Sequence, residues 1–174
     1  MKGPLLLAID IGTTACKAVL FQADGTERAK ASREYPVHYP RPLWAEQDPD
    51  DWWRAAVSAT RDCLERAGEG AKERIAAIGL SSQRETMAAV DADGRPLGRA
   101  ILWMDRRSRP QAEQVARAFG REAVHRRTGM LPDATFSLTK LMWLAQNQPE
   151  QVERAPVVLQ PKEDVAFRMT GVAG

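Results

Sequence analysis

The chain has few cysteines and histidines and no long hydrophobic run. Its 174 residues include 2 cysteines and 2 histidines, and Cys16 and Cys63 lack the spacing of a metal site. Such a count predicts reduced thiols rather than a disulfide framework. No apolar stretch reaches the length of a membrane span, and Asp10 interrupts the N-terminal apolar run too early for a signal peptide. We therefore expect a cytoplasmic protein with no membrane partner.

The chain also lacks a strong net charge and a Walker-type phosphate loop. Lys and Arg total 25 against 23 Asp and Glu, which gives a net charge of +2. This balance does not predict nucleic-acid binding. No G-x-x-x-x-G-K-[ST] motif occurs, so the P-loop class of nucleotide-binding proteins is excluded. The length and the 44% hydrophobic content are sufficient for one well-buried domain.

The N-terminal segment carries the most informative pattern. Residues 5–9 form a short apolar run that predicts a buried strand, and a carboxylate follows it directly. A glycine two positions later permits a tight turn and lets a ligand approach the backbone closely. Hydroxyl groups and a lysine come next, and these are donors that phosphate oxygens accept. The alternative is an ordinary hairpin with a polar turn. The candidate phosphate- and metal-binding residues are Asp10, Gly12, Thr13, Thr14 and Lys17.

A second group of polar and aromatic residues follows two later predicted strands. Functional groups at strand ends in α/β sheets commonly line a ligand crevice. Arg84 offers a rigid fork of donors, Glu85 a pair of acceptors, and Trp103 an apolar face for a carbon skeleton. The alternative is a structural Arg–Glu network beside a core tryptophan. The candidate substrate-binding residues are Gln83, Arg84, Glu85, Trp103 and Asp105.

The order of the predicted elements indicates an α/β or α+β domain. An antiparallel meander comes first, a helix starts at Asp48-Pro49, and a second buried strand covers residues 75–80. Further helices and a short strand at residues 157–159 follow. Helical periodicity predicts which residues face the core in two of these helices. In the helix that starts at Asp48-Pro49 they are Trp53, Val57, Thr60, Leu64 and Ala67. In the helix before Pro149 they are Leu138, Leu141, Met142 and Ala145.

Four segments, in this order, resemble the N-terminal part of the FGGY carbohydrate kinases, the family of glycerol kinase and xylulokinase. They are residues 10–14, 42–49, 78–86 and 100–107, and residues 159–171 give a weaker fifth match. The resemblance implies the actin-like ATPase fold, which is ribonuclease H-like, with ATP and Mg²⁺ as cofactors. It also implies that residues 1–174 are an incomplete N-terminal domain of a two-domain sugar kinase. We expect the catalytic-base Asp beyond Gly174, so that this chain alone is inactive.

The resemblance also assigns roles to individual residues. Asp10 would orient Mg²⁺ and its water, while Gly12, Thr13 and Thr14 would hold the ATP phosphates. Lys17 stands where glycerol kinases have an Arg that reaches the phosphates. Gln83-Arg84-Glu85-Thr86 matches the form found in glycerol kinases, in which the Arg and Glu contact substrate hydroxyls.

Other positions leave the substrate open. Thr135 stands where glycerol kinases have a Tyr that contacts the substrate, and the loop around Trp44 looks more like that of xylulokinases. We expect a kinase acting on a small-molecule sugar or polyol, xylulokinase-like in the first instance. The alternatives are a glycerol kinase and a non-catalytic sugar-binding or regulatory module of the same fold. A homodimer is compatible with a full-length enzyme of this kind.

Overall fold

The computed structural model describes residues 3–172, which divide into two compact units. The first unit comprises the residues up to 37, residues 48–83 and the residues from 161 onward. The second comprises residues 38–47 and 84–160. No helix within residues 3–172 is both long enough and apolar enough to cross a membrane.

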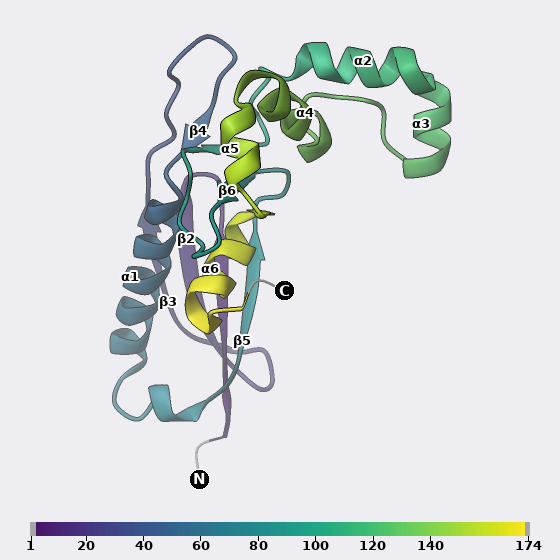
Figure 1. Cartoon of the computed structure of the whole chain (residues 1–174). Coiled ribbons are helices and arrows are strands. Elements are labelled where there is room, and N and C mark those ends of the chain that lie inside the picture. The colour runs from purple at the N-terminus through teal and green to yellow at the C-terminus, as the bar shows by residue number, and fades with distance from the viewer. Residues whose placement is uncertain (1–2, 173–174) are drawn as a thin grey trace. The chain divides into compact units, whose positions relative to one another are not determined.

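The first unit is built on a four-stranded sheet (Figure 1). Its strands are β1 (Leu5–Ile11), β2 (Ala15–Gln22), β3 (Glu27–Glu34) and β5 (Ile75–Ser82), in the order β3-β2-β1-β5. The first three strands form the predicted antiparallel meander, and β5 runs parallel to β1. A short 3₁₀ turn, η1 (Lys72–Arg74), leads into β5.

Two helices, α1 (Pro49–Ala67) and α6 (Pro161–Thr170), pack on one face of this sheet (Figure 1). Side chains of β1 alternate accordingly. Leu5, Leu7 and Ile9 are buried, whereas Leu6 and Asp10 are exposed on the opposite face. The exposed face therefore carries the candidate metal-binding carboxylate, and the buried face holds the unit together.

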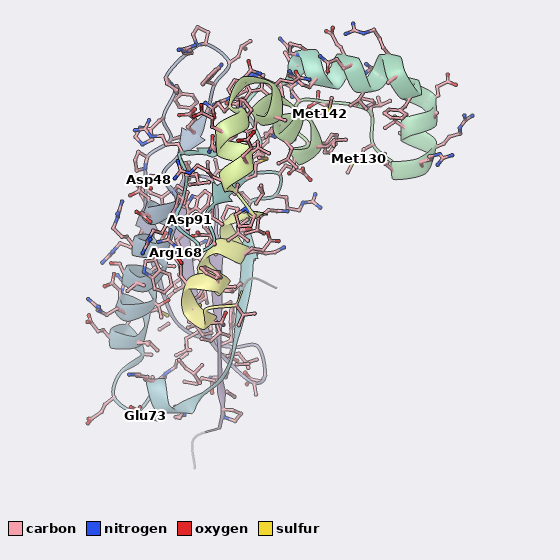
Figure 2. All side chains as sticks on the ribbon, in the orientation of Figure 1. Asp48, Glu73, Asp91, Met130, Met142 and Arg168 are labelled. Carbon is pink, nitrogen blue, oxygen red and sulfur yellow. The ribbon has the colours of Figure 1, made fainter. Side chains whose placement is uncertain are left out.

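Helix α1 begins where the sequence predicts. The Oδ1 atom of Asp48, labelled in Figure 2, accepts a hydrogen bond of 2.9 Å from the backbone N–H of Asp50, and Pro49 occupies the first turn. At the other end, the N–H of Gly68 donates to the carbonyl of Leu64 at a φ of 86°. Arg168 of α6 forms an ion pair of 2.8 Å with Asp50, which joins the two helices.

The buried face of α1 differs from the predicted one, although Ala67 is buried as predicted. The helix buries the side with Trp52, Ala59 and Cys63, which are all fully covered. The predicted stripe that includes Trp53 and Val57 instead lines an open, mainly apolar groove of about 440 Å³, together with residues of the sheet and of α6. The helix is thus apolar around more than half of its circumference.

Strand β5 is confirmed as a strand, but the expectation that it is buried is wrong. It forms one edge of the sheet, and most of its side chains are exposed, with Ile78 at 45%. An edge strand has a neighbour on one side only, so its apolar residues are covered less than those of β1.

The second unit combines two small antiparallel sheets with four helices. Its strands are β4 (Glu46–Gln47), β6 (Ala88–Val90), β7 (Ala100–Ile101) and β8 (Val157–Leu159). Its helices are α2 (Arg109–Phe119), α3 (Arg121–Thr128), α4 (Ser137–Asn147) and α5 (Pro149–Arg154). Strand β4 pairs with β7, and β6 pairs with β8. Met87, Ile101, Trp143 and Leu144 form a core cluster, against which Trp44 packs.

The buried face of α4 also departs from the predicted one. Leu138 is 58% exposed, while Lys140, Trp143 and Leu144 are buried. A lysine therefore occupies the covered side of this helix.

Candidate functional site

The turn between β1 and β2 is a tight one. Asp10 and Lys17 are register partners near the ends of the two strands, so their side chains lie on the same exposed face of the sheet. The N–H of Gly12 donates to the carbonyl of Ala15 at 3.0 Å. A Cβ atom on Gly12 would lie only 3.1 Å from that carbonyl oxygen, so a larger side chain would distort the turn. The predicted requirement for glycine here is thereby explained.

The carbonyl oxygen of Gly12 is held by two side chains. The phenol of Tyr35 donates to it at 2.6 Å, and the Nε2 amide of Gln83 donates to it at 3.2 Å. The backbone N–H groups of the same two residues bond to the carbonyls of Thr14 and Ile11. These four hydrogen bonds fix the turn from β3 and from the end of β5. Burial, followed by the charges of Cys16 and Asp10, raises the pKa of Tyr35, which keeps its phenol a donor.

Asp10 is exposed at this turn, beside Lys17 on one neighbouring strand and Ser81 on the other. The charge of Asp10 also acts on the buried thiol of Cys16. The pKa of this thiol is raised to about 12, mainly by burial and secondarily by the negative charge of Asp10. Within residues 3–172 no group of three or more His, Cys, Asp or Glu residues could hold a metal ion. A single exposed carboxylate fits Mg²⁺, which keeps several waters and is held by one or two carboxylates together with substrate phosphates.

Two residues at this turn were not predicted from the sequence. Tyr35 lies just beyond β3, and Ser81 is the register partner of Asp10 on β5. The register between β1 and β5 would have placed Ser81 beside Asp10. That register can be derived only once it is known that the two strands are parallel. No sequence pattern marks Tyr35, because its contact depends on how the chain leaves β3.

Glu85 adopts a left-handed backbone conformation, with a φ of 60°. Its Oε2 atom accepts hydrogen bonds from the backbone N–H and the Oγ hydroxyl of Ser137, at 2.8 and 2.9 Å. Glu85 thus supplies the side-chain acceptor at the start of α4, where the N-cap residue Phe136 makes no such bond, and these contacts hold Glu85 in its uncommon backbone conformation. Its Oε1 atom accepts no hydrogen bond from the residues that the structure describes. Arg84, the preceding residue, is exposed.

Trp103 and Thr86 are connected in the same unit. The backbone N–H of Trp103 donates to the Oγ1 hydroxyl of the buried Thr86 at 3.0 Å. Trp103 as a whole residue is 40% exposed. A half-exposed indole is available as an apolar surface for a ligand.

Asp105 is completely buried, with 0% exposure, and both of its oxygens are engaged within the protein. Oδ2 accepts from the N–H of Ala45 at 2.7 Å and from Arg107 at 2.8 Å, and Oδ1 accepts from the backbone N–H of Arg107. The structure therefore places Asp105 as a support for Arg107 and for the loop at residue 45, rather than on the surface with Trp103.

Thr135 is tied into a charged network. Its Oγ1 accepts from Arg106 at 3.1 Å and donates to Asp133 at 2.6 Å, while Arg106 and Asp133 form a two-point ion pair. Next to it, the ammonium of Lys140 donates to the Thr135 carbonyl, and Lys140 is fully buried. Burial lowers the pKa of Lys140 to about 8, although Glu85, Asp105 and Asp133 oppose that shift.

Comparison with known proteins gives consistent matches. The model for the N-terminal domain of the FGGY family of carbohydrate kinases matches residues 5–174. Glycerol kinase from Thermococcus onnurineus (strain NA1) is 38% identical over 170 residues, which cover 95% of this chain and 34% of that protein. Glycerol kinase from Bradyrhizobium sp. (strain ORS 278) is 43% identical over 152 residues, or 86% of this chain and 30% of that protein. The chain thus spans about a third of the length of these relatives.

Solved structures agree in fold. The ligand-bound xylulose kinase from Lactobacillus acidophilus superposes with a TM-score of 0.87 at 29% identity, over 97% of this chain and 34% of that one. The predicted α/β fold, that of the N-terminal half of an actin-like sugar kinase, is confirmed.

Proposed function

We propose, since this chain belongs to the FGGY family of carbohydrate kinases, that it contributes to the ATP-dependent phosphorylation of a sugar or polyol hydroxyl. The observation that carries this proposal is the turn at Gly12. Its carbonyl is fixed by Tyr35 and Gln83, and it follows directly on the exposed carboxylate of Asp10. Such a turn offers backbone and hydroxyl groups in a fixed geometry, which phosphoryl transfer requires because it depends on positioning and charge stabilisation.

In the first unit, Asp10 would hold Mg²⁺ through one carboxylate oxygen or through a metal-bound water. Gly12, Thr13 and Thr14 would contact the phosphates of ATP, and Lys17 would add positive charge beside them. When bound, Mg²⁺ neutralises charge that develops on the transferred phosphoryl group.

In the second unit, Arg84 and Glu85 would bind hydroxyls of the acceptor. Glu85 retains Oε1 for this purpose, since its hydrogen bonds to Ser137 use Oε2. Trp103 would pack against the carbon chain. Gln83 and Asp105 would act indirectly, Gln83 through the carbonyl of Gly12 and Asp105 through Arg107.

For the acceptor we propose a pentulose or a longer polyol rather than glycerol. The short side chain of Thr135 replaces the Tyr of glycerol kinases and is engaged with Arg106 and Asp133, which would leave room for a larger acceptor. Glycerol is the alternative, because the curated relatives described above are glycerol kinases.

The test uses the protein expressed from the complete reading frame that encodes this chain. ADP release is measured with Mg·ATP and, in turn, glycerol, erythritol, xylitol and xylulose. We expect turnover with at least one of them, and Asp10→Ala should abolish kcat while Asp24→Ala, at a distant hairpin turn, should not. Saturable sugar binding without ADP release would favour the non-catalytic module. Turnover that persists in Asp10→Ala would contradict the assigned role of the carboxylate.

A further inference from the structure

The second unit contains a cavity of about 620 Å³. It lies among β6, β7, the loop at residues 97–99 and the helices α4 and α5. Its volume is in the range of small-molecule sites. None of Arg84, Glu85 and Trp103 lines it, so the cavity is separate from the proposed acceptor site.

Among the charged residues that line the cavity, Arg107 is the most buried, since only 3% of its side chain is exposed. Its Nε and Nη2 atoms donate to Asp105 at 2.8 to 3.0 Å, and Nη2 also donates to Glu46 at 2.7 Å. The guanidinium stacks 3.6 Å from the ring centroid of Trp44. Three neighbours therefore fix the guanidinium in one orientation.

This fixed arrangement leaves polar groups without partners. Among the described residues, Nη1 of Arg107 has no acceptor, and Oε2 of Glu46 has no donor. Both residues line the cavity. Neither atom belongs to the buried side-chain atoms that lack a partner in the described residues, so both are open to the cavity. An available N–H donor and an available carboxylate oxygen in one lining match hydroxyl groups, which both donate and accept.

The rest of the lining suits the same kind of ligand. Asn147, Gln148 and Gln151, which carry amide side chains, also line the cavity, and Met87 and Leu97 add apolar groups for a carbon skeleton. Three of the lining residues are arginines and two are glutamates, and the buried Asp105 bonds to one of these arginines, Arg107. The charges at the cavity therefore balance, which favours a neutral ligand over an anion.

We propose that this cavity binds a neutral polyhydroxylated molecule, a polyol or a monosaccharide, through Arg107 and Glu46. Binding here does not require phosphoryl transfer, so it is measured without ATP on the protein from the complete reading frame, and it survives a failure of the proposed kinase function.

The experiment follows methionine methyl groups by NMR in that protein, labelled with ¹³C-methyl methionine. Met87 lines the cavity, whereas Met130 and Met142, labelled in Figure 2, do not. Xylitol, erythritol and glucose are added up to roughly 100 mM, since a millimolar Kd corresponds to only about −4 kcal/mol. We expect a saturable shift of the Met87 signal with at least one of them, and unchanged signals for Met130 and Met142.

Matched variants of α5 locate the binding. Gln151→Trp fills the cavity and should weaken the affinity at least about tenfold. Glu153→Trp changes an exposed position of the same helix that does not line the cavity, and it should leave the affinity unchanged. Glu46→Gln keeps the shape of the side chain but removes a carboxylate acceptor, and a several-fold loss is expected. Glu85→Gln, in the proposed acceptor site, should leave the Met87 shift intact.

Three results would overturn the proposal. The Met87 signal could remain fixed with every polyol, or its shift could be the same in Gln151→Trp as in the unmodified chain. Inorganic phosphate could also produce the shift when no polyol does, which would make the cavity an anion site.

Discussion

The phenol of Tyr35 donates a 2.6 Å hydrogen bond to the carbonyl oxygen of Gly12. This bond joins the segment after β3 to the turn that we assign to the ATP phosphates. Removing the hydroxyl leaves Gln83 as the other side-chain donor to that carbonyl, so the turn should loosen rather than collapse.

We therefore expect Tyr35→Phe to lower the free energy of unfolding by roughly 0.5–1.5 kcal/mol, the usual net value of one hydrogen bond. In the protein from the complete reading frame it should raise KM for ATP more than KM for the sugar. Urea unfolding and initial-rate kinetics measure the two effects. Tyr39→Phe is the matched control, because Tyr39 is 66% exposed and its hydroxyl donates to the sulfur of Met104, its one hydrogen bond within residues 3–172.

Gly12→Val tests the close approach of the turn to its own backbone. A Cβ at this position already lies 3.1 Å from the carbonyl oxygen of Ala15, and the γ-carbons of valine would add bulk where phosphates are expected. We predict loss of nucleotide binding, measured by titration calorimetry, with sugar binding retained. Gly79→Val is the control for a general effect of valine in this sheet, because Gly79 lies in β5 without a positive φ and a Cβ there meets no atom within 4 Å. Equal nucleotide affinity in the Gly12 variant and the unmodified protein would show that the turn does not bind phosphates.

Glu85 has two separable roles, a cap on α4 and a proposed contact to substrate hydroxyls. Glu85→Ala removes both, and we expect kcat/KM for the sugar to fall by about 10- to 100-fold because a charged hydrogen bond is lost. KM for ATP should barely change. Kinetics across glycerol, erythritol and xylulose provide the measurement.

Ser137→Ala separates the two roles. It removes one of the two hydrogen bonds to Oε2 of Glu85 but leaves the carboxylate in place. We expect a loss of about 1 kcal/mol in unfolding free energy, with the preference among acceptors unchanged. If Ser137→Ala reproduced the kinetic defect of Glu85→Ala, the carboxylate would be only a structural cap.

Local patterns in the sequence predict the elements and the turn at Gly12, but they do not predict which helical faces are covered. The strand at residues 5–9, the cap at Asp48 and the Asp-x-Gly-Thr-Thr turn all depend on near neighbours in the chain. The covered face of α1 depends on the sheet beneath it. That face carries Trp52 and small residues such as Ala59, whereas periodicity favours the larger side chains at Trp53 and Val57.

The partners of charged residues were equally hard to foresee. Asp105 and Arg107 are two residues apart, yet what determines the role of Asp105 is its bond to the backbone of Ala45, 60 positions away. In α4 the aliphatic stripe through Leu138 indicates one face, while the structure covers Lys140 instead. The Thr135 carbonyl that accepts from Lys140 is near in the chain, but two of the carboxylates that act on it, Glu85 and Asp105, are distant, and no local pattern records them.

The last prediction concerns this lysine. The pKa of Lys140 is lowered from 10.5 to about 8 by burial, against the opposing effect of Glu85, Asp105 and Asp133, and with a small further lowering from Arg106. Between these two values the unfolded chain holds the proton that the folded chain has released. Unfolding then takes up protons, so the free energy of unfolding rises as the pH increases from about 8 to about 10.5. The whole rise attributable to this group is roughly 3 kcal/mol.

Lys140→Met removes the titrating group but keeps a side chain of similar length, so this part of the pH dependence should disappear. Unfolding in urea, followed by tryptophan fluorescence from about pH 7 to about pH 10.5, gives the slope for each protein. The variant also loses the hydrogen bond to the Thr135 carbonyl. For this reason the comparison uses the slope of the unfolding free energy against pH rather than its absolute value. Lys162→Met is the control, because that side chain is 44% exposed. Parallel curves for the unmodified chain and Lys140→Met would mean that the ammonium keeps its proton throughout, and hence that the carboxylates around Lys140 outweigh its burial.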